Sequence, residues 1–174
     1  METIRTFEFE SPVGRMRLGS TDKGLCWVEL PGSGGRGFSG WVRAQVPDAE
    51  IVEDEASNRS AREQLFEYLA GDRIHFELKL DLRATPFQHS VYEELLAIPY
   101  GETRSYADVA REIGNPKAVR ATGTANGANP IPLIIPCHRV IASGGGLGGY
   151  GGGLPLKRKL LAMERSQARV GALL

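Results

Sequence analysis

Cysteine and long apolar runs are both scarce in this chain of 174 residues. The two cysteines, Cys26 and Cys137, lie far apart and outside any paired metal-binding spacing. Two cysteines cannot supply the framework of a disulfide-rich secreted domain, so we expect free thiols. The longest apolar stretches, such as residues 130–136, are far too short to span a bilayer, and no basic-then-apolar leader opens the chain. The sequence therefore predicts a cytoplasmic protein that does not enter a membrane.

Net charge is absent as well, because 21 basic residues balance 21 acidic ones, but the charges are unevenly distributed along the chain. Residues 1–100 hold 11 basic and 17 acidic side chains, a net of −6, whereas residues 101–174 hold 10 and 4, a net of +6. A cationic segment attracts polyanions, of which nucleic acid is the commonest in a cytoplasm. Attraction between the two segments is an equally good explanation at this point.

Hydrophobic residues at 41% and charged residues at 24% exclude a disordered or fibrous chain, and the first part of the sequence predicts an α+β domain. Alternating side chains predict strands over residues 4–10, 15–18, 25–30 and 74–80. The first three are expected to be antiparallel, with a hairpin signal at Asp22-Lys23-Gly24. Residues 31–40 hold five glycines and are expected to form a loop. Ser60-Ala61-Arg62-Glu63 matches a capping box and predicts a short helix that ends at Gly71.

Helical periodicity dominates the rest of the chain. It predicts three short helices over residues 87–98, 105–114 and 115–127. Ser105 opens a second capping box, and Asn115 followed by Pro116 suits the start of the third helix. Small residues give that helix a backbone that can approach a partner closely: Ala118, Ala121, Gly123 and Ala125. The last two helices have the shape of a helix-turn-helix or of an ordinary hairpin in a core, and Lys117 and Arg120 favour the DNA-binding motif.

The most informative stretch is residues 129–140, where an apolar run ends in Pro136-Cys137-His138-Arg139. A free thiol has a pKa of about 8.5, and a neighbouring histidine or cation lowers it enough to give a nucleophilic thiolate. The alternative is an inert thiol at the end of a buried strand. Neighbours in an extended chain point to opposite sides, so proton transfer between Cys137 and His138 needs a bridging water or a bent backbone.

A histidine that acts as a base needs an orienting partner, and Glu164 is the candidate. It follows Leu160 by one turn of the last predicted helix, over residues 155–164, and so faces the same buried side. A solvated carboxylate is the alternative. Residues 144–153 contain eight glycines and could be a flexible linker, but their position after Cys137 favours a pocket wall in which Tyr150 stacks on a flat ring.

Together these features resemble the methylated-DNA–protein-cysteine methyltransferase family, the O6-alkylguanine-DNA alkyltransferases. The resemblance rests on Asn129-Pro130, the motif from Pro136 to Val140, the glycine loop with Tyr150, and Glu164. Matching positions are frequent over residues 87–164 and fewer in the residues before them. It implies a two-domain α+β fold, in which an N-terminal ribonuclease-H-like domain with antiparallel strands covers residues 1–82. A C-terminal helical, winged-helix-like domain with a helix-turn-helix covers residues 83–174.

The resemblance also implies the reaction and its catalytic residues. Cys137 would accept the alkyl group, activated through water by His138, which Glu164 orients, while Asn129 ties the recognition helix to the nucleophile segment. Tyr106 would crowd a neighbouring phosphate and later donate a proton to the departing guanine. The donor would be O6-alkylguanine, with O4-alkylthymine as a second candidate, flipped out of double-stranded DNA. Each molecule would act once, irreversibly, as a monomer without a cofactor.

The resemblance also implies which residues contact the DNA and the flipped base, and that the protein binds the minor groove. Arg120 would take the place of the extruded base. The remaining expected contacts are Lys117, Ala118 and Ala121 on the recognition helix and Pro132, Val140, Tyr150, Gly151 and Gly152 around the base. Some relatives carry a serine where this chain has Gly151, so only a backbone N–H is expected to meet O6. Some relatives also bind zinc in the first domain, but Cys26 with scattered histidines makes no cluster, and we predict no metal.

Two other classes of function use part of the same residues. A Cys-His-Glu thiol hydrolase would turn over repeatedly and would leave the helix-turn-helix without a role. A non-catalytic regulator or lesion-binding protein would not need Cys137. Because no cysteine-rich regulatory domain precedes Met1, transcriptional activation is not expected.

Overall fold

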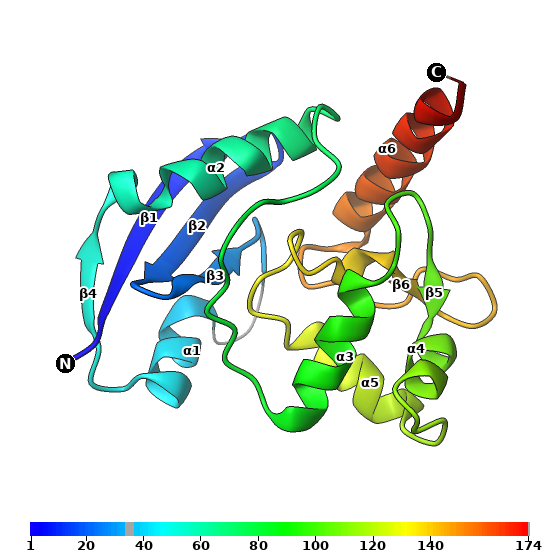
Figure 1. The fold of residues 1–174 in the computed structure, drawn as a ribbon, viewed down its shortest axis with the longest axis horizontal. Coiled ribbons are helices and arrows are strands. Elements are labelled where there is room, and N and C mark those ends of the chain that lie inside the picture. The colour runs from blue at the N-terminus through cyan, green and yellow to red at the C-terminus, as the bar shows by residue number, and fades with distance from the viewer. Residues whose placement is uncertain (34–36, 174) are drawn as a thin grey trace. The chain divides into compact units, whose positions relative to one another are not determined.

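The computed structural model describes residues 1–33 and 37–173, with side chains up to residue 171. The chain divides into two compact units, Met1–Arg83 and Ala84–Leu174. The first unit combines a sheet with two helices, and the second is mainly helical, so the predicted α+β class is confirmed (Figure 1). In the part of the chain that is described, no helix combines the length and the apolar character that crossing a membrane requires.

A four-stranded sheet forms the centre of the first unit, in the order β3-β2-β1-β4. Its strands are β1 (Thr3–Ser11), β2 (Gly14–Thr21), β3 (Gly24–Glu29) and β4 (Glu50–Glu53). The first three strands are antiparallel, as predicted. β4 pairs parallel to β1 at the edge of the sheet and was not predicted, because its four residues are too few to show an alternating pattern.

The strand predicted over residues 74–80 is wrong. Of this segment only Leu80 pairs, in a single bridge with Leu25 at the start of β3. The side chain of Gln64 contributes to the difference, because it accepts a hydrogen bond from the Glu77 backbone N–H at 2.8 Å and donates one to the Glu77 carbonyl at 3.2 Å. These bonds satisfy the backbone of Glu77 without a neighbouring strand. Phe76 packs its ring against Tyr68, 5.4 Å between centroids.

The two helices of this unit cover opposite faces of the sheet (Figure 1). They are α1 (Gly37–Gln45) and α2 (Glu55–Leu69). Ile4 belongs to the face under α1, where it forms a buried cluster with Cys26 and Phe38. Phe9, which points the other way along β1, meets Phe66 of α2 at 5.8 Å between ring centroids. The alternation of β1 that predicted a strand therefore separates the two apolar layers.

The starting residues of α1 and α2 both differ from what the sequence predicted. Residues 31–40 were expected to be loop, yet α1 begins at Gly37, and residues 34–36 lie outside the described part. α2 begins five residues before Ser60, because Asp54 accepts a hydrogen bond from the Ser57 backbone N–H at 3.1 Å and acts as the N-cap. The capping box predicted at Ser60 is therefore wrong.

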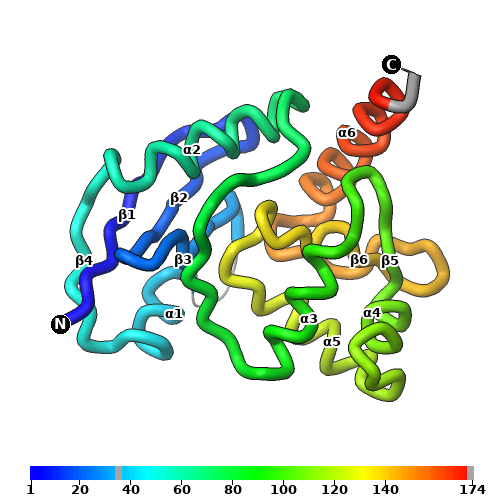
Figure 2. The backbone as a smooth tube through the Cα atoms, viewed as in Figure 1, coloured from blue at the N-terminus to red at the C-terminus, as the bar shows by residue number. Residues whose placement is uncertain are grey.

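The second unit consists mainly of helices. They are α3 (Pro86–Leu96), α4 (Tyr106–Glu112), α5 (Val119–Gly127) and α6 (Leu154–Leu173), and the two-residue strands β5 (Arg104–Ser105) and β6 (Val140–Ile141) pair in parallel. α3, α4 and α5 pack on one another, and the tight turn between α4 and α5 can be followed in Figure 2. The predicted box of Ser105 and Asp108 caps α4.

The third predicted helix begins later than expected. Asn115 and Pro116 belong to a turn, closed by a 2.9 Å hydrogen bond from the Ala118 N–H to the Asn115 carbonyl, and α5 begins only at Val119. Its N-cap residue, Ala118, makes no side-chain capping bond. α6 is longer than predicted and continues from Glu164 to Leu173. The polar residues beyond Glu164 gave no apolar stripe from which to predict this extension.

Replacement of Gly24 tests the contact between the hairpin and the segment that ends at Leu80. A Cβ on Gly24 would lie 2.4 Å from the Lys79 carbonyl oxygen, and its φ of +145° disfavours other residues. Gly24→Ala should lower the free energy of unfolding by about 3 kcal/mol in urea titrations. Gly32→Ala is the matched control, with a φ of +67° and no described heavy atom within 4 Å. It should cost only about 1 kcal/mol of backbone strain, and equal losses would contradict the steric account.

Candidate active site

Residues Cys137–Arg139 form a single 3₁₀ turn between Pro136 and β6, rather than the end of a strand. The backbone is therefore bent, but successive side chains in such a turn still diverge by about 120°, so a bridging water remains the expected route between Cys137 and His138. All three side chains are buried, with 5% of Cys137, none of His138 and 8% of Arg139 exposed. α6 packs against this turn.

Glu164 of α6 is fully buried and binds two residues of that turn. Its Oε1 lies 2.7 Å from His138 Nε2, and it accepts hydrogen bonds from Arg139 Nε at 2.9 Å and Arg139 Nη2 at 3.0 Å. Arg139 also donates to the Ile98 carbonyl at 2.8 Å. The structure therefore excludes the solvated carboxylate. Arg139 was expected only as a cation close to the thiol and not as a partner of Glu164, although a buried carboxylate generally needs a cationic partner, which was the signal available in the sequence.

The same contacts fix the charge of each group. Burial alone would raise the pKa of Glu164, but the hydrogen bonds from His138 and Arg139 outweigh it and bring the pKa to about 2. Burial lowers the pKa of His138 despite the opposing effect of Glu164. At neutral pH the carboxylate is charged and the imidazole is neutral. An Nε2–H directed at the carboxylate leaves the lone pair on Nδ1, the tautomer that a general base requires.

The Cys137 thiol is neutral at rest, in contrast to the expected thiolate. Burial raises its pKa to about 11, and this effect exceeds that of the groups that favour the anion. Those groups are a hydrogen bond from the Asn129 side chain, the charge of Lys157, and the backbone N–H groups of Cys137 and His138. A reaction that used this sulfur as its nucleophile would therefore have to remove the proton during the reaction rather than before it. Cys26 is also a buried free thiol, and burial raises its pKa to about 12.

Side-chain amides connect α5 to the nucleophile segment. Asn129, two residues after α5, donates to the Ile135 carbonyl at 2.8 Å and accepts from the Ile131 N–H at 3.0 Å. Asn126, on α5 itself, donates to the Cys137 carbonyl at 3.3 Å. Asn126 was not predicted, because an asparagine inside a helix carries no signal of a partner eleven residues later.

Tyr106, the first residue of α4, lies between two glycines. A Cβ on Gly148 would lie 2.8 Å from the Tyr106 hydroxyl oxygen, and one on Gly123 would lie 3.8 Å from its ring. The φ of Gly148 is +70°, so backbone conformation and close approach both require glycine there, whereas the Gly123 contact leaves room for a methyl group. Burial, followed by the proximity of Cys137, raises the pKa of Tyr106. The hydroxyl therefore keeps its proton at neutral pH.

The residues predicted to surround the base differ in exposure. Pro132 and Val140 are buried, Gly152 is half-buried and Gly151 is exposed. Tyr150 is half-buried, with its ring edge-on to His138 at 6.4 Å between centroids. Burial raises the Tyr150 pKa well above its usual value, and its buried hydroxyl has no hydrogen-bond partner among the described residues.

One face of the α4–α5 pair is open and cationic. Arg120, Lys117 and Ala121 are exposed and Ala118 is half-buried. Within the described part of the chain, neither Arg120 nor Lys117 forms an ion pair. Thr122 and other inward residues of α5 are buried. The helix therefore presents positive charge and little side-chain bulk on the side that its packing leaves free.

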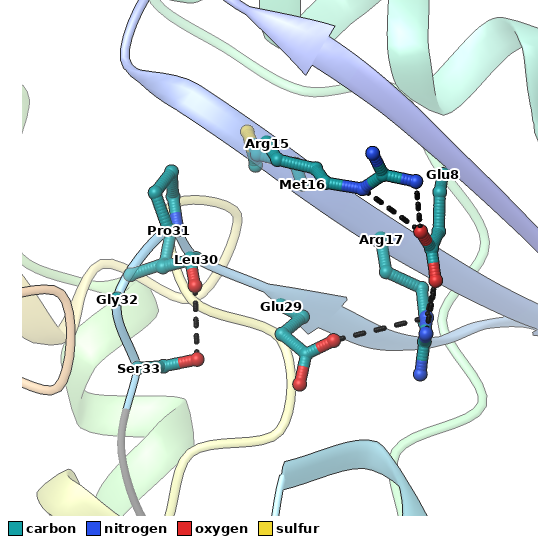
Figure 3. Close-up of a pocket in the computed structure, with 9 residues that line it drawn as sticks. All are labelled: Glu8, Arg15, Met16, Arg17, Glu29, Leu30, Pro31, Gly32 and Ser33. Carbon is teal, nitrogen blue, oxygen red and sulfur yellow. Dashed lines mark hydrogen bonds and ion pairs between the residues drawn. The ribbon is translucent and has the colours of Figure 1, made fainter.

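A separate pocket of about 300 Å³ lies within the first unit (Figure 3). Arg15 and Arg17 line it, but both bond to Glu8, and Arg17 also lies 3.8 Å from Glu29. These carboxylates neutralise the guanidinium groups, so the pocket offers no free charge to a ligand. Among the residues that the structure describes, no group of three or more histidine, cysteine or acidic side chains gathers as a metal site.

Comparison with known proteins identifies the family. Residues 86–166 match the family described as "6-O-methylguanine DNA methyltransferase, DNA binding domain". A methylated-DNA–protein-cysteine methyltransferase of Methanosarcina acetivorans is 46% identical over 158 residues, which cover 91% of this chain and 96% of that protein. The chain belongs to the methylated-DNA–protein-cysteine methyltransferase family. Its activity is direct-reversal DNA repair, in which a methyl group passes from methylated DNA to a cysteine of the protein.

Solved structures agree with this membership of the methyltransferase family. A crystal structure of Mycobacterium tuberculosis OGT in complex with DNA matches 95% of this chain and 94% of that one, with 42% identity and a TM-score of 0.80. An O6-methylguanine-DNA methyltransferase from Pyrococcus kodakaraensis, 22% identical, shares the fold with a TM-score of 0.61. These relatives do not favour a thiol hydrolase or a non-catalytic protein.

Acid titration of a Glu164→Gln variant tests the shared carboxylate. At pH 7 the variant should lose about 3–5 kcal/mol of unfolding free energy, because Arg139 stays buried without its charged partner. The pKa of Glu164 is about 2 in the native state against 4.5 unfolded, so its contribution is complete above pH 4.5 and is lost toward pH 2. The difference from wild type should shrink over that interval in urea titrations.

Glu112→Gln is the matched control for this titration. It removes one carboxylate from an exposed position on α4 and should follow the wild type at every pH. A stability difference for Glu164→Gln that stays constant between pH 4.5 and 2 would contradict the assignment.

Proposed function

We propose that Cys137 is the methyl acceptor and that the transfer occurs once per molecule, irreversibly, from O6-alkylguanine in double-stranded DNA. The observation that carries this proposal is the buried turn in which Cys137 adjoins a neutral His138 held by the Glu164 carboxylate. Cys26 lacks a comparable environment, since it belongs to an apolar cluster with Ile4 and Phe38.

The proton of Cys137 passes to His138 through one bridging water. His138 can accept it because its imidazole is neutral, and the imidazolium that forms is stabilised by Glu164 at 2.7 Å. The thiolate then attacks the alkyl carbon, a carbon–sulfur bond forms, and the bond to guanine O6 breaks. A thioether is a stable bond that ordinary side chains do not hydrolyse, which accounts for a single turnover without a cofactor.

Tyr106 donates the proton that the departing guanine needs. Its pKa is raised, so the hydroxyl is protonated before the reaction. Tyr150, with a buried hydroxyl that lacks a partner among the described residues, would stack on the flipped base and gain a hydrogen-bonding environment there. Pro132, the Val140 backbone, and the N–H groups of Gly151 and Gly152 would complete the base contacts.

DNA binding is assigned to α4 and α5 as a helix-turn-helix within a winged-helix-like unit. The small exposed face of α5, with Ala118 and Ala121, suits the narrow minor groove, and Lys117 suits a phosphate. Arg120 would enter the duplex in place of the extruded base and offset part of the cost of flipping. The first unit would be the ribonuclease-H-like support, and the protein would act as a cytoplasmic monomer.

Intact-mass analysis tests the acceptor. After mixing with duplex that carries O6-methylguanine, the wild type should gain the mass of one methyl group, and peptide mapping should locate it on Cys137. Cys137→Ala should gain none, and Cys26→Ala should behave as the wild type. Transfer to Cys26, or release of the methyl group with repeated turnover, would contradict the proposal.

Arg120→Ala tests the side chain that replaces the base. The variant should react at least tenfold more slowly with methylated duplex but at the wild-type rate with free O6-benzylguanine, because only the duplex requires extrusion. Arg165→Ala is the control, since it removes the same charge from an exposed position on α6. It should leave the ratio of the reaction rates with the two substrates unchanged. If Arg120→Ala lowered the reaction rate equally with both substrates, the proposed insertion of Arg120 into the duplex would be contradicted.

A further inference from the structure

Lys157 of α6 is a fully buried lysine with an unusual set of partners. Its Nζ donates to three backbone carbonyls, those of Val140 at 2.6 Å, Leu147, and Gly149 at 3.1 Å. Three donors therefore meet three acceptors, and no carboxylate binds this ammonium within the described residues. Burial of an unneutralised charge is costly, so a neutral side chain would have filled the space more favourably if packing were its only purpose.

The three carbonyls show what Lys157 holds. Val140 follows the 3₁₀ turn that contains Cys137, whereas Leu147 and Gly149 flank Gly148 on either side in the glycine loop. Gly148 is the residue against which the Tyr106 hydroxyl packs, and the Gly149 N–H bonds to that hydroxyl. Lys157 thus connects the loop at Tyr106 to the backbone next to the nucleophile.

Among the residues that the structure describes, no anionic group pairs with the charge of Lys157. The Glu164 carboxylate is already occupied by His138 and Arg139, and His138 is neutral. Burial lowers the pKa of Lys157 itself, an effect that Cys137 opposes, and the Lys157 charge in turn lowers the pKa of Cys137. A thiolate at Cys137 would supply the negative charge that the resting site lacks.

We propose that Lys157 is a positioning residue that fixes the glycine loop against Tyr106 and holds a positive charge beside Cys137 to stabilise the thiolate formed during transfer. This inference rests on the proposed function. Lys157 would thereby meet two requirements of the reaction. It would position Tyr106, the proton donor, and it would balance the negative charge of the Cys137 thiolate. Both requirements can be measured separately, because carbamidomethylation of Cys137 needs a thiolate but no proton donor.

The test compares Lys157→Met with wild type and with Lys159→Met, which removes an exposed lysine two residues along α6. Because each molecule reacts once, the number of methyl groups transferred gives the active fraction, and rates are expressed per active molecule. Carbamidomethylation of Cys137 by iodoacetamide is followed by peptide mapping from pH 7 to 10. Methyl transfer from O6-methylguanine duplex is measured at pH 7.5.

Lys157→Met should shift the pH profile of Cys137 carbamidomethylation upward by about one unit, because loss of a nearby opposite charge raises a thiol pKa by that order. At a fixed pH this shift means roughly tenfold slower carbamidomethylation. Methyl transfer should slow by more than the carbamidomethylation does, since Tyr106 is also displaced. Lys157→Arg, which keeps the charge, should restore the carbamidomethylation profile, and Lys159→Met should match the wild type in both reactions.

Wild-type rates and an unshifted profile for Lys157→Met would overturn the proposal. If that variant does not fold, Lys157→Gln replaces it, since an amide keeps donors for the carbonyls but no charge; a wild-type profile for Lys157→Gln would overturn the proposed charge effect. Failure of the wild type to methylate Cys137 would instead refute the proposed function, because the iodoacetamide comparison does not depend on DNA.

Discussion

The buried carboxylate of Glu164 is the interaction on which the site depends. It links a turn near the middle of the second unit to the final helix, since His138 and Arg139 both bind it from residues adjacent to Cys137. A carboxylate without access to water stays ionised only when such donors surround it. The carboxylate in turn favours the tautomer of His138 that carries its proton on Nε2, so a single side chain influences both the local geometry of the turn and the proton affinity of the imidazole.

In this arrangement the Cys137 thiol has little reactivity in the resting protein. The Cys137 thiol is 5% exposed and its pKa is about 11, so few molecules hold a reactive thiolate at neutral pH. In the proposed mechanism, proton acceptance by His138 is part of the reaction itself rather than a property of the resting protein. A nucleophile that reacts only once gains from such protection, because a chance encounter with another electrophile would consume the molecule as surely as its proper substrate.

The sequence was most informative where the signal is local. Adjacent residues placed Cys137 beside His138, and helical spacing placed Glu164 on a buried face, without knowledge of the fold. The start of α2 could not be predicted, because Ser60 with Glu63 matches a capping box in isolation and only the folded chain shows that Asp54 is the N-cap. The partners of Lys157 could not be predicted, since a lysine in an amphipathic helix normally reaches solvent and its acceptors are backbone atoms that carry no residue-specific signal.

The placement of Glu164 and Lys157 on one helix has a further consequence. Seven residues separate them, which is close to two full turns, so both side chains leave α6 in nearly the same direction. Deletion of a single residue from the intervening segment would rotate one of them by about 100° relative to the other. The number of residues in this interval is therefore constrained at every position, whereas side-chain identity is constrained chiefly where the interval is buried, at Leu160 and Leu161.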